Sequence, residues 1–337
     1  MNKLNKIGIS ALCGSLAGIS AANAGELTAS GGVALTWISQ DDVVTGNPIG
    51  MASGISFAGS GELDNGWGVT LNIAHDDANA YSNANVIIAL PGLGDVRIDQ
   101  GTSGTGIQRL DDVTPTVWEE ADGAGISAQI NKIMGTSAGA TIEVTPSELM
   151  PAGLTTRVAY SKDADSGNTN DKVAGGDSGV LASGWDLTVE AGSDLLGVDG
   201  LTLYAGMAEI EQYQNSSTHN GDVSETVLGI KYAMGGFTVG YQVTDEDTGQ
   251  TTTDNYENTS YGITFNVNDD LSIGYNHTES DETGQSLATA EADSIQAAYT
   301  MGGATFSIAE VEVENSGYQT AAANDKEGTV IKLGLAF

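Results

Sequence analysis

Alternation of apolar and polar side chains over stretches of about ten residues is the feature that most constrains this chain. In residues 329–337 the odd positions from 331 onward are large and apolar, whereas the even positions are polar or small. The same alternation recurs at 67–73, 237–244 and 271–276. A period of two places successive side chains on opposite faces of a β-strand, so each stretch predicts a strand with one apolar and one polar face.

The length of these stretches separates two kinds of β protein. Strands of soluble sandwiches average about 5 to 6 residues, whereas a tilted strand that crosses a membrane needs about 9 to 11. Most stretches here reach the longer range, and an offset of the alternation at 309–313 predicts a β-bulge. The predicted strands are 26–40, 49–61, 67–76, 84–90, 95–101, 138–145, 153–162, 184–193, 200–209, 223–234, 237–245, 256–267, 271–280, 290–301, 304–314 and 326–337.

The connections between the predicted strands alternate in length. Short ones such as 235–236 and 302–303 consist of turn residues, and longer polar ones such as 163–183 and 315–325 lie between them. An even strand number with turns at one end and loops at the other is typical of bacterial outer-membrane barrels. The sheet must close, because an open edge in hydrocarbon leaves backbone groups unpaired. We therefore predict an all-β fold, a sixteen-stranded antiparallel transmembrane β-barrel.

Aromatic side chains support this orientation, because they gather near the predicted turns and the end of the chain, where a girdle at one membrane interface would place them. They are Tyr232, Phe237, Phe265, Tyr299, Phe306 and Phe337.

The first residues have the features of an export signal. Lysines near the start are followed by an apolar stretch and by the small-residue cleavage site Ala22-Asn23-Ala24. We expect residues 1–24 to be a signal peptide and residues 25–337 to form one barrel domain. The single cysteine, Cys13, leaves with the signal, and Leu12 directly before it disfavours a lipoprotein signal.

Charge excludes one class of partner and restricts others. The chain has 45 Asp and Glu residues against 11 Lys and Arg, a formal net charge of -34, so it lacks the basic face that nucleic acid requires. No Gly-x-Ser-x-Gly elbow, phosphate-binding loop or histidine cluster is present, so we expect no enzyme activity and no cofactor. Acidic loops leave calcium binding open, although 163–174 departs from the EF-hand pattern. Divalent cations at these loops would bridge them to lipopolysaccharide phosphates.

Three segments resemble the general porins of Gram-negative bacteria, particularly the alphaproteobacterial type. They are the C-terminal pattern of Leu333, Leu335 and Phe337, residues 93–101, and residues 141–146 with the strand that follows them. The resemblance implies a homotrimer in the outer membrane that lets ions and small hydrophilic solutes diffuse, with the C-terminal pattern as its signal for the assembly machinery. It also implies that the third long loop, about 102–136, folds into the lumen. Porins often carry several arginines here, but 137–140 has none.

Strand parity assigns the charged side chains to the lumen. A Lys or Arg facing lipid at the midplane costs about 2 to 4 kcal/mol, which by itself favours the inner face. The predicted pore-lining basic residues are Arg97, Arg157, Lys231 and Lys332, and the acidic ones are Asp99, Asp186 and Glu190. The loop adds Arg109, Asp111, Asp112, Glu119, Glu120 and Asp122. A basic wall opposite an acidic loop creates a transverse field that favours polar solutes, and the acidic excess predicts a weak preference for cations.

Two other functions fit the same pattern. A substrate-specific outer-membrane channel shares the barrel and differs only in its lumen contacts. An acidic secreted or surface β protein that binds sugar or calcium would stay monodisperse without detergent and would lack an aromatic girdle.

Overall fold

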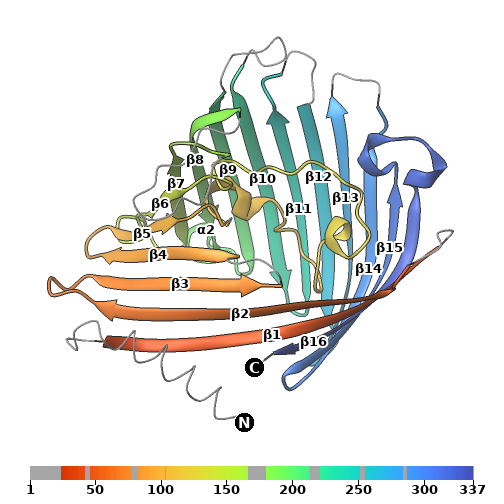
Figure 1. The fold of residues 1–337 in the computed structure, drawn as a ribbon, viewed down its shortest axis with the longest axis horizontal. Coiled ribbons are helices and arrows are strands. Elements are labelled where there is room, and N and C mark those ends of the chain that lie inside the picture. The colour runs from red at the N-terminus through yellow and green to blue at the C-terminus, as the bar shows by residue number, and fades with distance from the viewer. Residues whose placement is uncertain are drawn as a thin grey trace.

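The strands of this chain close into a barrel. A computed structural model describes residues 24–41, 46–77, 82–102, 104–165, 180–212, 221–250, 255–283 and 287–336. Within these residues sixteen antiparallel strands each pair with their sequence neighbours, and β1 pairs with β16 (Figure 1). The predicted sixteen-stranded antiparallel barrel is confirmed. Residues 1–23 of the expected signal peptide and Phe337 lie outside the described residues.

The strand bounds follow the predicted ones within a few residues. The strands are β1 (Ala24–Gln40), β2 (Ile49–Glu62), β3 (Gly68–Asp76), β4 (Asn83–Leu90), β5 (Gly94–Asp99), β6 (Thr141–Thr145), β7 (Leu154–Ser161), β8 (Leu181–Ala191), β9 (Leu201–Gln212), β10 (Val223–Met234), β11 (Phe237–Asp247), β12 (Asn255–Asn266), β13 (Leu271–Thr283), β14 (Ala290–Met301), β15 (Ala304–Glu314) and β16 (Lys326–Ala336). Short helices are η1 (Gly106–Leu110), η2 (Ala121–Gly123), α2 (Ser193–Leu196), η3 (Ser316–Tyr318) and η4 (Ala322–Asn324).

Large apolar side chains point outward, as the alternation predicts. Leu228 on β10 is 62% exposed and Ile295 on β14 is 65% exposed, while polar neighbours such as Gln296 are buried on the inner side. The predicted aromatics of the described strands share the outer parity, and Phe237 stacks on Phe265 with ring centroids 4.3 Å apart. In the described residues no helix is long and apolar enough to cross a membrane.

Two predicted details are wrong. Strand β6 begins at Thr141 rather than at residue 138, because Gly139 turns back and donates its N–H to the Thr136 carbonyl at 3.1 Å. The β-bulge predicted at 309–313 does not form, since β15 stays in register with both neighbours over that stretch. The offset in the sequence has another cause: Val311 and Val313 face inward, where a buried apolar cluster covers them.

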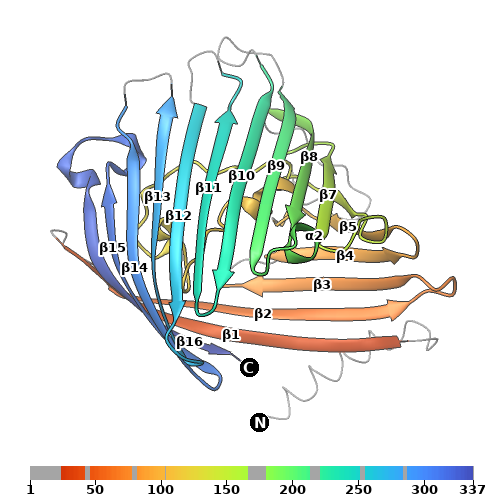
Figure 2. The same ribbon diagram turned by 180° about the vertical axis from the view of Figure 1, so that it is seen from behind.

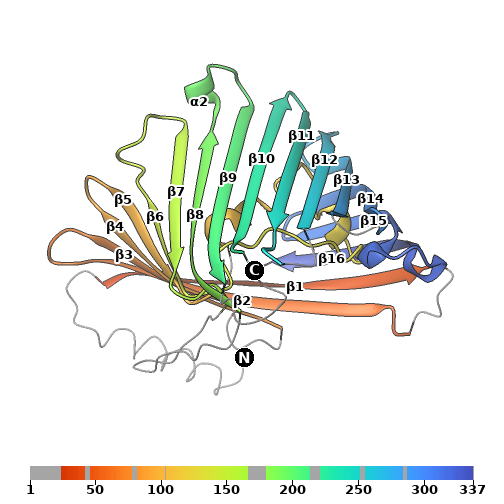
Figure 3. The ribbon, with the colours of Figure 1, turned by 90° about the horizontal axis from the view of Figure 1, so that it is seen from above.

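Residues 100–140, which join β5 to β6, cross the inner side of the sheet. In Figure 1 this yellow segment passes in front of β9 to β13, and in Figure 2, seen from behind, the same strands pass in front of the segment. The view from above in Figure 3 shows it between the upright strands β8 to β13 and the long strands β1 and β2. We call this segment the inner loop.

Candidate functional site

The inner loop packs along much of the barrel wall. Its helix η1 contacts β7, β8, β9 and β10, and η2 contacts β13 and β14. These strands turn their polar faces inward, so the loop meets side chains that can bond its backbone. The loop therefore replaces water with wall side chains as partners for its peptide groups.

Inward carboxylates hold the two ends of the loop. Asp186 on β8 accepts hydrogen bonds from the Thr136 hydroxyl at 2.8 Å, from the Thr136 N–H at 3.2 Å and from the Ile107 N–H at 3.4 Å. Glu225 on β10 accepts the Gly135 N–H at 2.7 Å. Asp186 is 0% exposed and Glu225 is 3% exposed. Buried carboxylates require such donors, so burial and loop docking depend on each other.

Amide side chains hold the middle of the loop. Gln242 on β11, Asn276 on β13 and Gln296 on β14 are all almost completely buried. The bonds are Gln242 Nε2 to the Asp111 carbonyl at 3.0 Å, the Ala121 N–H to Asn276 Oδ1 at 2.7 Å, and Gln296 Nε2 to the Glu119 carbonyl at 2.6 Å. An amide can both donate and accept, so it can bond either polarity of a passing peptide.

Apolar contacts complete the docking at two places. Ile107, Leu110 and Ile133 of the loop are buried against Tyr204 and Val227 of the wall. Farther along, small loop residues meet inward valines and alanines; this second cluster is Ala121, Ala124, Ile126 and Ala128 with Ala292, Ala309, Val311, Val313 and Val330. The small side chains let the loop backbone approach the strands closely, which excludes water from the bonds described above.

All three arginines of the chain lie together near the start of the loop. Arg97 on β5 stands opposite Glu143 on β6 in the sheet register. Each guanidinium has a carboxylate partner: Arg97 pairs with Asp99 at 2.6 Å, Arg109 with Glu143 at 2.5 Å, and Arg157 with Glu190. We call these six residues the arginine ladder. Paired charges of opposite sign cancel at a distance, so the ladder contributes little net positive charge.

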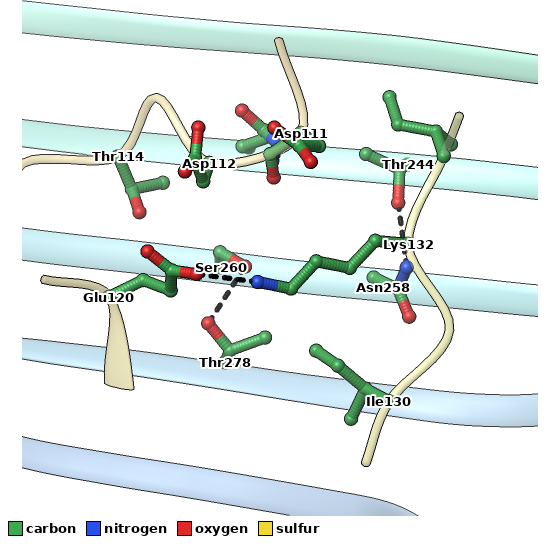
Figure 4. A pocket seen from close by; sticks show the side chains of 12 residues that line it. Asp111, Asp112, Thr114, Glu120, Ile130, Lys132, Thr244, Asn258, Ser260 and Thr278 are labelled. Carbon is green, nitrogen blue, oxygen red and sulfur yellow. Dashed lines mark hydrogen bonds and ion pairs between the residues drawn. The ribbon is translucent and has the colours of Figure 1, made fainter. Parts of the chain in front are cut away.

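A second charged cluster lies within the loop itself. Lys132 Nζ is 2.6 Å from Glu120 Oε1 and 3.8 Å from Asp122 Oδ2. Figure 4 shows Lys132 reaching across to Glu120, with Asp111 and Asp112 beside them. Between this cluster and strands β11 to β13 lies a cavity of about 20 Å³, enough for one water molecule, and most of the residues that line it are polar or charged. A single lysine thus faces four carboxylates.

The crowded loop carboxylates titrate at unusual pH. Burial, and then the neighbouring Asp112, raises the pKa of Asp111 to about 8. Burial and a hydrogen bond with Glu120 raise the pKa of Glu119 to about 7. Burial alone would also raise the pKa of Glu120, but hydrogen bonds from Glu119 and Lys132 outweigh it and lower that pKa to about 2. Each adjacent pair therefore retains a proton near neutral pH.

The other predicted lumen residues occupy separate places. Lys332 on β16 lies with its Nζ 5.0 Å from the ring centroid of Trp118 in the loop, which joins loop and wall by a cation–π contact. Lys231 on β10 has the inner parity, opposite Gly240 of β11. Asp186, expected to line the pore, is instead completely covered by the loop. Of the C-terminal pattern, Leu335 is 40% exposed on the outer face.

Sequence reasoning missed several residues that hold the loop. They are Glu143, Glu225, Gln242, Asn276 and Gln296 on the wall, and Lys132 and Trp118 in the loop. One signal was available for Glu143, Gln242 and Gln296, because each occupies an inner position between outward apolar or aromatic neighbours. Large polar side chains at such positions need partners inside the barrel.

The wall formed by β1 to β4 differs from the wall that the loop covers. Its inner positions on β1 and β2 hold small, uncharged side chains over most of their length: Ser30, Gly32, Ala34, Thr36, Ala52, Gly54, Ser56, Ala58 and Ser60. Charged side chains of this wall, such as Glu62 on β2 and Asp76 on β3, lie near strand ends. We call the inner face of β1 and β2 the bare wall.

The described part of the chain has no preformed metal-binding site. Within the described residues no group of three or more His, Cys, Asp or Glu side chains is arranged to hold a metal ion. The segment 166–174 that departs from the EF-hand pattern, and His219, lie outside the described residues.

Solved structures share this fold. A variant of the Rh. blastica porin is 17% identical over 93% of this chain and 100% of its own, with a TM-score of 0.58. An anion-selective porin from Comamonas acidovorans is 12% identical over 93% of this chain and 99% of its own, with a TM-score of 0.62. At these identities the likeness concerns the fold. No curated protein sequence matches the chain.

A family model carries the assignment further, because it depends on sequence rather than on shape. The model described as Gram-negative porin matches residues 8–332, which is nearly the whole chain. Together with the closed barrel and its outward apolar band, this match places the chain in the bacterial outer membrane. The chain therefore belongs to the Gram-negative porin family and is an outer-membrane channel protein.

Proposed function

We propose that ions and small hydrophilic solutes diffuse passively through this barrel, that the inner loop narrows the passage, and that the passage weakly prefers cations. The observation that carries the preference is the uneven pairing of charge on the loop. Residues 102–136 contain five acidic residues against two basic ones. Both basic residues, Arg109 and Lys132, already have carboxylate partners.

Charge on the surrounding wall points the same way. The arginines that would attract anions are each paired within the arginine ladder, and the bare wall on β1 and β2 offers no lysine or arginine at its inner positions. Lys231, Lys326 and Lys332 are the remaining basic residues on the inner face of the described strands. With one proton retained by each of the pairs Asp111/Asp112 and Glu119/Glu120, the five acidic residues of the loop still carry three negative charges against the two positive charges of Arg109 and Lys132, so small cations gain more than anions near the loop.

Planar-bilayer recording tests the transport proposal. The purified protein should give stable conductance steps, and liposomes that contain it should swell faster in small sugars than in large ones. A salt gradient across the same bilayer reports the preference as the sign of the reversal potential. Absence of conductance steps from folded barrels would contradict passive diffusion, and an anion-preferring reversal potential would contradict the charge assignment.

We also propose the route by which the chain reaches the membrane. Residues 1–24 are removed on export, residues 25–337 assemble through the C-terminal pattern that ends in Phe337, and the barrels form homotrimers. N-terminal sequencing of the exported protein should start at Gly25, and Phe337→Ala should reduce its assembly. Mass measurement of the native complex in detergent should give three copies, and a monomeric mass would contradict the trimer.

A further inference from the structure

The outer wall carries a groove that transport does not use. It lies over β11 to β15, has a volume of about 480 Å³, and is apolar along most of its length. Ile263, Phe265, Ile273, Ile295 and Ile308 form its sides. Ala297 forms its floor, because this small side chain stands between Ile273 and Ile308 in the sheet register. The groove faces outward, so it is accessible to lipid and not to the lumen.

One end of the groove is acidic. Glu310 lines it directly, and Ile295 is its partner across the strands. The adjacent outward pair is Asp293 with Glu312. Asp293 is held in place by the Tyr275 hydroxyl and by His277 Nδ1, which is 2.9 Å from its Oδ1. The groove therefore leads from its apolar part to a cluster of carboxylates, one of which, Asp293, is held in place by hydrogen bonds.

Charge on this outer face has one sign. Outward charged positions on the described strands β9 to β16 are all acidic, whereas Lys231, Lys326 and Lys332 have the inner parity. Several carboxylates stand directly opposite one another: Glu257 with Asp281, Glu279 with Glu291, Glu291 with Glu314, Asp293 with Glu312, and Glu312 with Glu327. Like charges in such positions destabilise a sheet unless a cation lies between or beside them.

We propose that this groove binds a membrane lipid whose head group carries an amine cation, with an acyl chain over Ala297 and the ammonium among Asp293, Glu310 and Glu312. The apolar lining fits an acyl chain, and the carboxylates fit a cationic head group. A purely anionic head group would meet these carboxylates without a Lys or Arg beside it. The proposal concerns the outer wall alone and stands whether or not the barrel prefers cations.

Native mass spectrometry of the delipidated protein in detergent tests the proposal. The probes are phosphatidylethanolamine and phosphatidylglycerol with identical acyl chains, each titrated with a chelator present. Phosphatidylethanolamine should bind more tightly. The double change Glu310→Gln and Glu312→Gln should weaken its binding about tenfold, the effect of losing a charge-assisted contact. The matched double change Glu209→Gln and Glu257→Gln, at outward carboxylates away from the groove, should leave binding unchanged.

A groove-filling change provides the second arm. Ala297→Phe should weaken binding of phosphatidylethanolamine, whereas Ala205→Phe, at an outward alanine on β9, should not. The circular-dichroism signal of the barrel serves as the folding control for every variant. Equal binding of the two lipids, or tight binding of phosphatidylethanolamine by the Glu310/Glu312 variant, would overturn the amine assignment. Binding of phosphatidylglycerol that requires added Mg²⁺ and exceeds that of phosphatidylethanolamine would assign the site to cation-bridged phosphate instead.

Discussion

Two inner walls of the same barrel have opposite compositions. The wall from β6 to β16 carries carboxylates, amides and apolar residues that bind the inner loop, whereas the bare wall of β1 and β2 carries glycine, alanine, serine and threonine. The polar groups of the covered wall form hydrogen bonds with the loop, so few of them face solvent. In our proposal the passage runs between the loop and the bare wall, so the loop charges determine its selectivity and small side chains keep it wide.

Carboxylates have two different roles in this barrel. Asp186 and Glu225 are buried and accept backbone N–H groups, so they hold the loop in place. The five acidic residues of the loop keep three negative charges near neutral pH, because the pairs Asp111/Asp112 and Glu119/Glu120 each retain a proton, and Arg109 and Lys132 neutralise only two of these charges. The wall carboxylates therefore fix the position of the loop, and the loop carboxylates attract cations.

Removal of a wall anchor should have the largest effect on transport. Asp186→Ala leaves three loop donors without their acceptor, and each buried unpaired group costs about 1 to 3 kcal/mol. The loop should detach from β8, and single-channel conductance and current noise should both rise. The matched change Asp76→Ala, at an inward carboxylate of β3 outside the loop contact, should leave both unchanged. Equal records from the two variants would contradict the anchoring role.

Charge added to the bare wall should have the next largest effect. Ala34→Arg places an unpaired cation on the inner face of β1, opposite Ala52 and across the proposed passage from the loop. The reversal potential in a salt gradient should shift toward anions. Ala34→Gln adds comparable bulk without charge, so it should lower the conductance while keeping the preference. A shift shared by both variants would show that bulk, and not charge, controls selectivity.

Changes in the arginine ladder should be smaller, because each one alters a compensated pair. Arg157→Ala leaves Glu190 without this cation, and Arg97→Ala does the same to Asp99, which Thr102 still holds, so each should strengthen the cation preference modestly. Reversal potentials of the two variants against the parent protein measure the effect. If both conductance and selectivity remained at parent values, these arginines would lie outside the constriction.

Acidity should modulate the preference by the smallest amount. The pKa of Asp111 is raised to about 8 by burial and Asp112, so this group is neutral at pH 6 and ionised at pH 9. The cation preference should therefore grow over that range, and Asp111→Asn should flatten the growth. The raised pKa also means that the docked loop binds a proton more tightly than the free loop does. Docking is then strongest below the pKa and weakens as the pH rises through it.

Parity accounts for the part of this architecture that could be predicted. Alternation depends on each residue and its immediate neighbours, so it located the strands and assigned Arg97, Arg157, Lys231 and Lys332 to the inner parity. It also led to one wrong detail, because Val311 and Val313 face inward. Apolar residues at inner positions suggested a bulge only because the loop that covers them comes from a distant part of the chain.

The path of the inner loop could not be predicted in the same way. Its contacts join residues far apart in the sequence, such as Ala121 with Asn276 and Thr136 with Asp186, and no local pattern encodes such pairs. The alternating sequence therefore predicts that Asp186 lines the pore, whereas in the structure it is buried and holds the loop. Compensation of the arginines was hidden for the same reason, since Arg109 meets Glu143 only after the strands have closed.

The reversal potential of the unmodified protein in a potassium chloride gradient at neutral pH tests the central claim most directly. The Comamonas acidovorans porin, which is described as anion-selective, serves as the reference, because its reversal potential in the same bilayer should have the opposite sign. Charge on the inner loop predicts a potential of the sign set by potassium. A potential of the same sign as the Comamonas reference would contradict the account.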